Sequence, residues 1–228
     1  VAAFVTPLRL LSVVNNELVN VCARCALGFH WCRLAIHQWS EGDVGCVVWD
    51  GALVLGKFID HKNCTGEWDT KKSVLELGSG TGIVGIISCS FGNDVVLTDL
   101  SQFLPLLDKN LEENRSHLKG KARARTLEWG VPLTPHVFTP DIILMSECVY
   151  YEKAVDPLLK TMTELCGPNT EVLLSYEDRD NEANSAAVAR FLQGCRQHFV
   201  IDEVPTEDQH PDFSSHDIHI LRLKPIMQ

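Results

Sequence analysis

The chain has 228 residues, 45% of them hydrophobic, and its 30 acidic and 20 basic residues give a formal net charge of −10. This length allows one sizeable α/β core and leaves little room for a second domain. An acidic surface repels phosphate backbones, which argues against a nucleic-acid partner and favours a cationic one, such as a lysine-bearing protein surface.

The nine cysteines are odd in number and scattered through apolar stretches, which is typical of buried thiols in a reducing compartment. We therefore expect a cytoplasmic protein. The two longest apolar runs are interrupted by Arg24 and Asp50, so no membrane span is expected.

Residues 1–43 fit no regular pattern and are predicted to form a divergent N-terminal segment, as strands or partly disordered, ahead of one domain over residues 44–228. The segment contains Cys22, Cys25, His30 and Cys32, a spacing that could in principle bind zinc. Such a site would be crowded into a very short stretch, so hydrophobic packing is the preferred interpretation and no metal is expected.

Strand and helix patterns alternate along the rest of the chain. Helices are predicted over residues 47–59, 81–90, 101–111, 155–165 and 184–198. Strands are predicted in the segments SVLEL (73–77), DVVLTD (94–99), ARTLEWG (124–130, with its exit loop), PDIILMSE (140–147), EVLLSY (171–176), HFVIDEV (198–204) and DIHILRLK (217–224).

This alternation is typical of a parallel sheet covered by helices on both faces. The last two strands have only an irregular loop between them and can pair antiparallel. We therefore predict a single-domain α/β fold, a Rossmann-like, doubly wound, mostly parallel seven-stranded sheet with an antiparallel edge strand.

The most informative segment is VLELGSGTGIVG, residues 74–85, which predicts a strand, a glycine-rich turn and a helix. Read from Gly80, it matches the G-x-G-x-x-G turn of dinucleotide-binding proteins. Read from Glu76, it matches the E-x-G-x-G-x-G turn of S-adenosyl-L-methionine enzymes.

The second register is favoured because the apolar strand then ends directly before Gly78, whereas Gly78 and Ser79 would make a poor strand end. Glu76 would lie beneath the turn, where its carboxylate can accept backbone amides or attract a cationic cofactor. S-adenosyl-L-methionine carries an ammonium and a sulfonium, whereas the pyrophosphate of a dinucleotide would be repelled. The predicted cofactor is S-adenosyl-L-methionine.

Three further residues are candidates for the cofactor site. Asp99 ends the second strand of the domain, where a carboxylate accepts the ribose hydroxyls of an adenosine in either kind of cofactor. Trp129 follows the third strand and could stack on the adenine or close the rim of the sheet. For Trp49, cofactor contact and core packing both stay open.

Several segments together resemble the seven-strand methyltransferases that modify lysines of other proteins. They are VGCVVWDGALVLGKFI, VLELGSGTGIVG, VVLTDL, LEWG, ILMSECVYYE and DIHI, and the match runs from about Leu34 to Lys224. The resemblance implies cofactor contacts at Trp49, Gly78, Ser79, Gly80, Asp99, Trp129 and Ser146. It is nearest to the members that act on the valosin-containing-protein type of AAA ATPase, so the implied partner is such an ATPase or a related chaperone.

The family also carries a D-x-x-Y signature after the fourth strand, which here begins with Glu147 and ends with Tyr150. The resemblance implies that Glu147 docks and orients the substrate amine and that Tyr150 aims it. The extra methylene of Glu147 displaces the carboxylate, and a 1 Å misplacement can cost on the order of a hundredfold in rate. A cofactor-binding protein with impaired turnover, because of Glu147 or the divergent N-terminal segment, is therefore one alternative. A small-molecule methyltransferase on the same fold is the other, since the strand-end motif alone does not exclude it.

Overall fold

The computed structural model describes residues 18–24, 31–39, 44–133 and 138–226. Its main feature is a seven-stranded sheet in the order β5-β4-β3-β6-β7-β9-β8. All seven predicted strands are present. They are β3 (Ser73–Leu77), β4 (Asp94–Asp99), β5 (Ala122–Thr126), β6 (Ile142–Ser146), β7 (Glu171–Glu177), β8 (Phe199–Glu203) and β9 (Ile218–Pro225).

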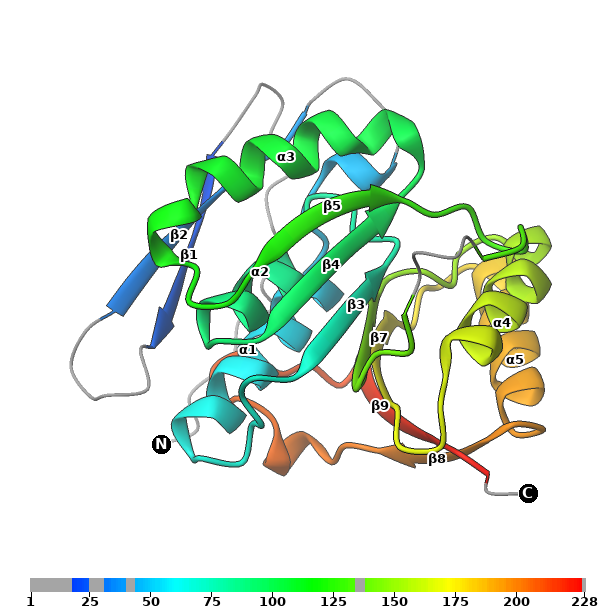
Figure 1. The fold of residues 1–228 in the computed structure, drawn as a ribbon. Helices are drawn as coiled ribbons and strands as arrows, with labels where there is room; N and C mark the ends of the chain where they lie inside the picture. The colour runs from blue at the N-terminus through cyan, green and yellow to red at the C-terminus, as the bar shows by residue number, and fades with distance from the viewer. Residues whose placement is uncertain (1–17, 25–30, 40–43, 134–137, 227–228) are drawn as a thin grey trace.

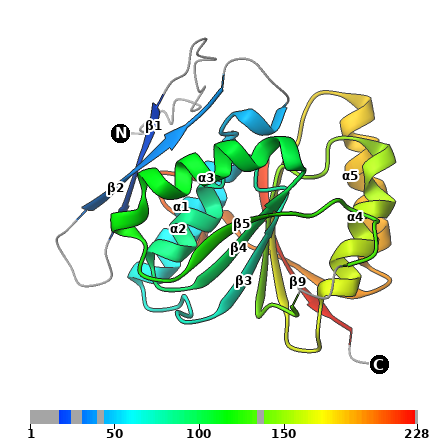
Figure 2. The ribbon, with the colours of Figure 1, turned by 45° about the horizontal axis from the view of Figure 1, so that its top comes forward.

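Helices cover both faces of this sheet (Figures 1 and 2). One face packs against α1 (Asp50–Cys64), α2 (Ile83–Ser90) and α3 (Leu104–Glu113), and the other against α4 (Glu152–Leu165) and α5 (Glu182–Cys195). Short 3-10 turns complete the helical elements at η1 (Val44–Cys46), η2 (Ser101–Phe103), η3 (Arg115–His117) and η4 (Thr206–Asp208).

The central strands are apolar throughout because both of their faces are buried. Successive side chains of a strand point to opposite faces, so Val74 lies in the core beneath α1 and α2 while Leu75 and Leu77 lie beneath α4 and α5. The same alternation holds in β6, where Leu144 belongs to the first core and Ile143 to the second. The predicted layer architecture is confirmed.

The antiparallel strand lies one position inside the edge of the sheet. It is β9, which pairs antiparallel with both β7 and β8, so β8 forms the edge. No crossover helix separates β8 from β9, and β9 therefore returns antiparallel, as predicted. The predicted antiparallel pairing at the edge of the sheet is confirmed, with β9 inserted between β7 and β8.

An N-terminal hairpin of β1 (Leu18–Arg24) and β2 (Trp31–His37) lies beside α3 (Figure 1). The Asn110 side chain hydrogen-bonds the backbone N–H and carbonyl of His37 at 2.7 and 3.1 Å, and Asn114 does the same to Ala35 at 2.9 and 2.8 Å. Leu34 and Ile36 are fully buried in the core. These contacts hold β2 against the main domain.

The boundary predicted after residue 43 falls at residues outside the described part of the chain, so it stays a prediction. The same is true of Cys25 and His30 from the possible zinc set, and the side chains of Cys22 and Cys32 are not described.

Candidate active site

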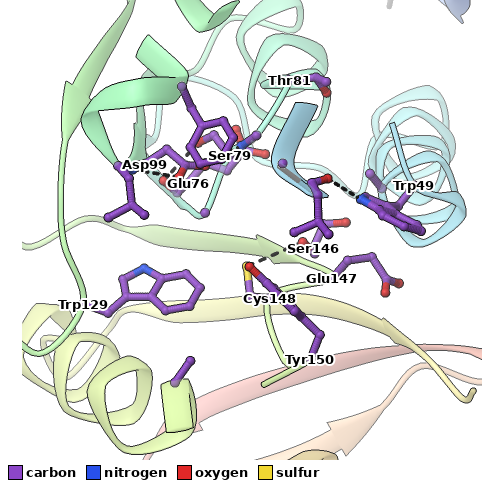
Figure 3. A pocket seen from close by; sticks show the side chains of 18 of the residues that line it. Trp49, Glu76, Ser79, Thr81, Asp99, Trp129, Ser146, Glu147, Cys148 and Tyr150 are labelled. Carbon is purple, nitrogen blue, oxygen red and sulfur yellow. Dashed lines mark hydrogen bonds between the residues drawn. The ribbon is translucent and has the colours of Figure 1, made fainter. Parts of the chain in front are cut away.

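A cavity of about 530 Å³ opens at the carboxyl ends of the parallel strands. The chain runs outward through β4 and β5 on one side of β3, and through β6 and β7 on the other, so β3 and β6 form the switch point at which α/β sheets bind ligands. All ten predicted site residues line this cavity: Trp49, Glu76, Gly78, Ser79, Gly80, Asp99, Trp129, Ser146, Glu147 and Tyr150. Figure 3 shows Asp99 and Trp129 at one end, Trp49 and Glu147 at the other, and Ser146 and Tyr150 between them.

The glycine-rich turn has the register that begins at Gly78. Strand β3 ends at Leu77, and Gly78, Gly80 and Gly82 have φ angles of 61°, 52° and 79°. This left-handed region is costly for any residue with a Cβ. Each glycine of the predicted G-x-G-x-G run therefore occupies a conformation that requires it.

The turn also brings neighbouring segments close to the backbone. A Cβ on Gly80 would lie 2.7 Å from the Gly45 carbonyl oxygen, and one on Gly78 would lie 2.9 Å from the Trp129 ring. The backbone of the glycine turn therefore forms one wall of the cavity, with the Trp129 ring beside it and the carboxyl groups of Asp99 and Glu147 at its two ends. Its volume is within the range of about 300–1,000 Å³ that is usual for cofactor sites, so these residues fit a nucleoside cofactor with a cationic end.

Asp99 is held at the end of β4 by two backbone amides. The Gly80 N–H donates to its Oδ2 at 2.7 Å, and the Leu100 N–H donates to its Oδ1 at 2.7 Å. A carboxylate oxygen can accept more than one hydrogen bond, so a ligand hydroxyl could also be accepted here. The side chain is therefore fixed in orientation where it faces the cavity.

Glu76 is only 2% exposed, and its Oε2 accepts the Gly85 N–H in the first turn of α2 at 3.2 Å. Burial raises its pKa to about 8, against weaker lowering by the contacts with Ser79 and Gly85. The carboxyl is therefore mostly neutral at pH 7 when no cation is bound. The predicted repulsion of pyrophosphate is correspondingly weaker, and the discrimination between the two cofactors rests on the glycine register.

The two tryptophans belong to the cavity wall. Trp129 is half-buried beside Gly78. Trp49 precedes α1 as its N-cap residue, and its Nε1–H donates to the Val44 carbonyl at 2.8 Å. Helix α1 thus begins at Asp50, later than predicted, because residues 47–49 form the approach to the site instead.

The end of β6 carries polar atoms without partners in the described structure. The buried Ser146 Oγ and Glu147 Oε1 form no hydrogen bond. Glu147 adopts a φ angle of 53°, uncommon for a residue with a side chain. Burial raises its pKa to about 7; Arg179 opposes this shift, while Glu177 and Asp50 add to it.

Cys148 and Arg179 are among the cavity-lining residues that sequence reasoning missed. The Cys148 thiol donates to the Leu77 carbonyl at 3.2 Å, and burial raises its pKa, which makes it a wall residue and not a nucleophile. Arg179 pairs with Glu147 at 3.0 Å. The signal that could have identified Arg179 is its position two residues after β7, at the edge where the other site residues gather.

Two kinds of feature are absent from the part of the chain that the structure describes. No three His, Cys, Asp or Glu residues there are grouped as a metal site would require. Among the helices of the described ranges, none has the length and apolar character needed to cross a membrane.

The fold is that of known methyltransferases. A TehB-like S-adenosylmethionine-dependent methyltransferase from Corynebacterium glutamicum superposes with a TM-score of 0.54 at 14% identity, covering 80% of this chain and 90% of that one. A tRNA (m1A58) methyltransferase from Aquifex aeolicus gives a TM-score of 0.55 at 12% identity, covering 82% and 73%. At such identities the likeness shows the fold alone.

Sequence comparison is more specific. The model of a family described as lysine methyltransferase matches residues 30–195. The protein N-lysine methyltransferase METTL21A of Danio rerio is 37% identical over 210 residues, covering 91% of this chain and 89% of its own length. The EEF1A lysine methyltransferase 3 of Mus musculus is 36% identical over 165 residues, covering 72% and 67%.

Together with the family match, the fold and the cavity define an S-adenosyl-L-methionine-dependent methyltransferase. The chain belongs to the lysine methyltransferase family, and it is a protein-lysine N-methyltransferase whose substrate is a protein. The similarities support this family and not one particular member of it.

Proposed function

We propose that this methyltransferase modifies a lysine of a valosin-containing-protein-type AAA ATPase or a related chaperone, using Glu147 and Tyr150 to hold the lysine. The observation that supports the roles of Glu147 and Tyr150 is that they line the same cavity as the glycine turn and Asp99, and the choice of substrate is proposed from the resemblance of the sequence. A lysine entering beside them would reach the part of the cavity where the methyl donor binds.

The cofactor roles are proposed from position. Asp99 would accept the ribose hydroxyls, the backbone of Gly78, Ser79 and Gly80 would hold the methionine portion, and Trp129 would contact the adenine. Glu76, Trp49 and Ser146 would lie toward the cationic end. When bound, S-adenosyl-L-methionine supplies a methyl group attached to a positively charged sulfur.

The residues of the chain must align the lysine amine and exclude water. The pKa of a free lysine is about 10.4, and desolvation in the cavity lowers it toward the neutral form that can accept a methyl group. A nearby carboxylate has the opposite effect on the amine. Glu147 is therefore assigned to docking and orienting the lysine, and Tyr150 to hydrogen-bonding its nitrogen.

A second candidate substrate comes from the comparisons. The mouse relative is named for methylation of EEF1A, so an EEF1A-type elongation factor is the competing protein. The acidic character of the chain, with a net charge of −10, is compatible with a basic surface around the lysine of either substrate.

Transfer of labelled methyl groups from S-adenosyl-L-methionine tests the proposal. Purified AAA ATPase, chaperone and EEF1A are offered in parallel, and the modified lysine is located by mass spectrometry. We expect label on the ATPase or chaperone and loss of that label in Glu147→Ala. Label on EEF1A alone would contradict the proposed substrate.

The same assay separates the remaining alternatives. Label in a small solute of a cell extract would indicate a small-molecule methyltransferase. Cofactor binding without transfer would indicate impaired turnover, particularly if Glu147→Asp, which restores the family signature, creates activity. We expect instead that Glu147→Asp lowers kcat/KM, because the shorter side chain cannot keep its 3.0 Å contact with Arg179.

A further inference from the structure

Arg179 joins three groups at the corner of the cavity. Its Nη2 lies 3.0 Å from Glu147 Oε2, its Nε lies 3.1 Å from Glu177 Oε2, and its guanidinium carbon lies 4.8 Å from the centre of the Trp49 ring. A planar guanidinium can hold two carboxylates and stack on an aromatic face at the same time, which an ammonium cannot do with the same geometry. Arg179 therefore links β7, the end of β6 and the start of α1.

Glu147 depends on this contact more than an ordinary surface carboxylate would. Its side chain is 10% exposed, and Oε1 has no hydrogen-bond partner in the described structure. Oε1 is packed against Gly51, where a Cβ would collide with it. A buried carboxylate with one oxygen unpartnered stays ionised only if the other oxygen receives a strong, charge-assisted hydrogen bond.

The neighbouring charges increase this dependence. Glu177 on β7 and Asp50 on α1 are both acidic and both disfavour a charge on Glu147, whereas Arg179 favours it. The Asp50 carboxyl is itself partly buried, with Oδ1 lacking a partner. Arg179 is thus the cation that opposes burial and two like charges around Glu147.

We infer that Arg179 is a positioning residue for lysine docking: it holds the Glu147 side chain in place and favours its charged form, which receives the substrate ammonium. This inference rests on the proposed role of Glu147. It assigns to Arg179 no contact with the methyl donor, so its loss should weaken protein-substrate recognition and leave donor affinity intact.

The first test is a titration that needs no turnover. Glutamate carboxyl carbons are labelled with ¹³C, and the Glu147 signal is assigned by its absence in Glu147→Gln. In Arg179→Met, which retains the length of the side chain without its charge, we expect the pKa of Glu147 to rise. Arg179→Lys, which keeps the charge but not the planar fork, should give a smaller rise and provides a second variant if the first does not fold.

The second test uses activity on the protein substrate. In Arg179→Met we expect kcat/KM at neutral pH to fall about ten- to a hundredfold, the range expected for loss of one charged hydrogen bond. The fall should lie mainly in KM, and the acid limb of the pH profile should move to higher pH. In the Glu147→Gln background the same substitution should have little further effect.

Arg190→Met is the matched control. This arginine on α5 also pairs with two carboxylates, Glu152 at 3.1 Å and Asp156 at 2.6 Å, but these pairs are exposed and none of the three residues lines the cavity. Arg190→Met should change neither the titration of Glu147 nor the KM for the protein substrate.

An unchanged Glu147 titration in Arg179→Met would overturn the inference, as would weakened binding of the methyl donor with an unchanged pH profile. Because the titration is read without turnover, it decides the role of Arg179 even if no protein substrate is methylated, in which case only the proposed function fails.

Discussion

Glu76 is a carboxyl group almost without solvent contact, and its raised pKa makes stability depend on pH. The pKa is about 8 in the folded chain, against about 4.3 for an unfolded glutamate. Between these values the native state keeps a proton that the unfolded state has released, so the free energy of unfolding falls as pH rises. Glu147, with a pKa of about 7, contributes in the same direction.

We therefore expect the urea midpoint of the cofactor-free protein to fall between about pH 5 and about pH 8. Glu76→Gln, which cannot ionise, should show a shallower fall, while the exposed control Glu207→Gln should keep the wild-type slope. A midpoint that rises with pH over this interval would show that Glu76 is ionised in the folded chain.

Asp99 carries the prediction for cofactor affinity. Hydrogen bonds to a charged acceptor contribute about 1.5–3 kcal/mol, so Asp99→Ala should weaken binding of S-adenosyl-L-methionine by roughly ten- to a hundredfold in calorimetry. Part of this loss comes from the Gly80 N–H, which then lacks its acceptor. Asp108→Ala, on the exposed side of α3, should leave the affinity unchanged, and an equal loss there would contradict the assignment.

Ten of the residues that line the cavity could be predicted from the sequence because they follow a strand or belong to a recognisable motif. Arg179 belongs to no motif, and it meets Glu147 only because β6 and β7 are adjacent and parallel. The protonation state of Glu76 could not be predicted from the sequence either. Its motif placed a carboxylate beneath the turn, but the degree of burial that keeps it protonated depends on the packing of α2 against β3 and β4.

At the scale of elements, the close packing of the glycine turn against η1 can be tested separately from the backbone strain of its positive φ angles. Gly80 has a positive φ and would also place a Cβ 2.7 Å from the Gly45 carbonyl oxygen, whereas Gly66 has a φ of 76° and open space around it. Gly66→Ala should therefore show only the strain of a left-handed residue, about 1–2 kcal/mol.

Gly80→Ala should cost more than Gly66→Ala in urea unfolding and should also abolish measurable cofactor binding, because the turn and η1 must move apart. Gly66→Ala should bind the cofactor as the wild type does. Equal stability losses in the two variants, with binding retained in both, would show that the contact with Gly45 is dispensable.

Most strands of the sheet could be predicted because they are short apolar runs bounded by turn residues, whereas β5 (ARART) is mostly polar and only its segment could be indicated. Their order could be predicted only in part. The β8–β9 loop lacks a crossover helix and so indicated antiparallel pairing, but nothing local shows that β9 inserts between β7 and β8. The packing of the β1–β2 hairpin on α3 could not be predicted either, since Asn110 and Asn114, which hydrogen-bond β2, lie far along the chain.

At the scale of the whole molecule, some of the acidic residues behind the net charge of −10 lie close to the site. Exposed carboxylates at Asp178, Asp180 and Glu182 follow β7 at the edge that bears the cavity. A basic protein surface approaching this edge would be attracted over roughly 10 Å at 0.1 M salt and only about 3 Å at 1 M.

We therefore expect KM for the protein substrate to rise with ionic strength while kcat stays constant, measured as initial rates of methyl transfer over a sodium chloride series. Combined Asp180→Asn and Glu182→Gln substitutions should flatten this dependence. Neutralising Glu112 and Glu113, exposed at the far end of α3, removes the same charge away from the site and should leave the dependence as steep as in the wild type. A KM insensitive to salt would mean that substrate recognition relies on shape and apolar contact instead of long-range attraction.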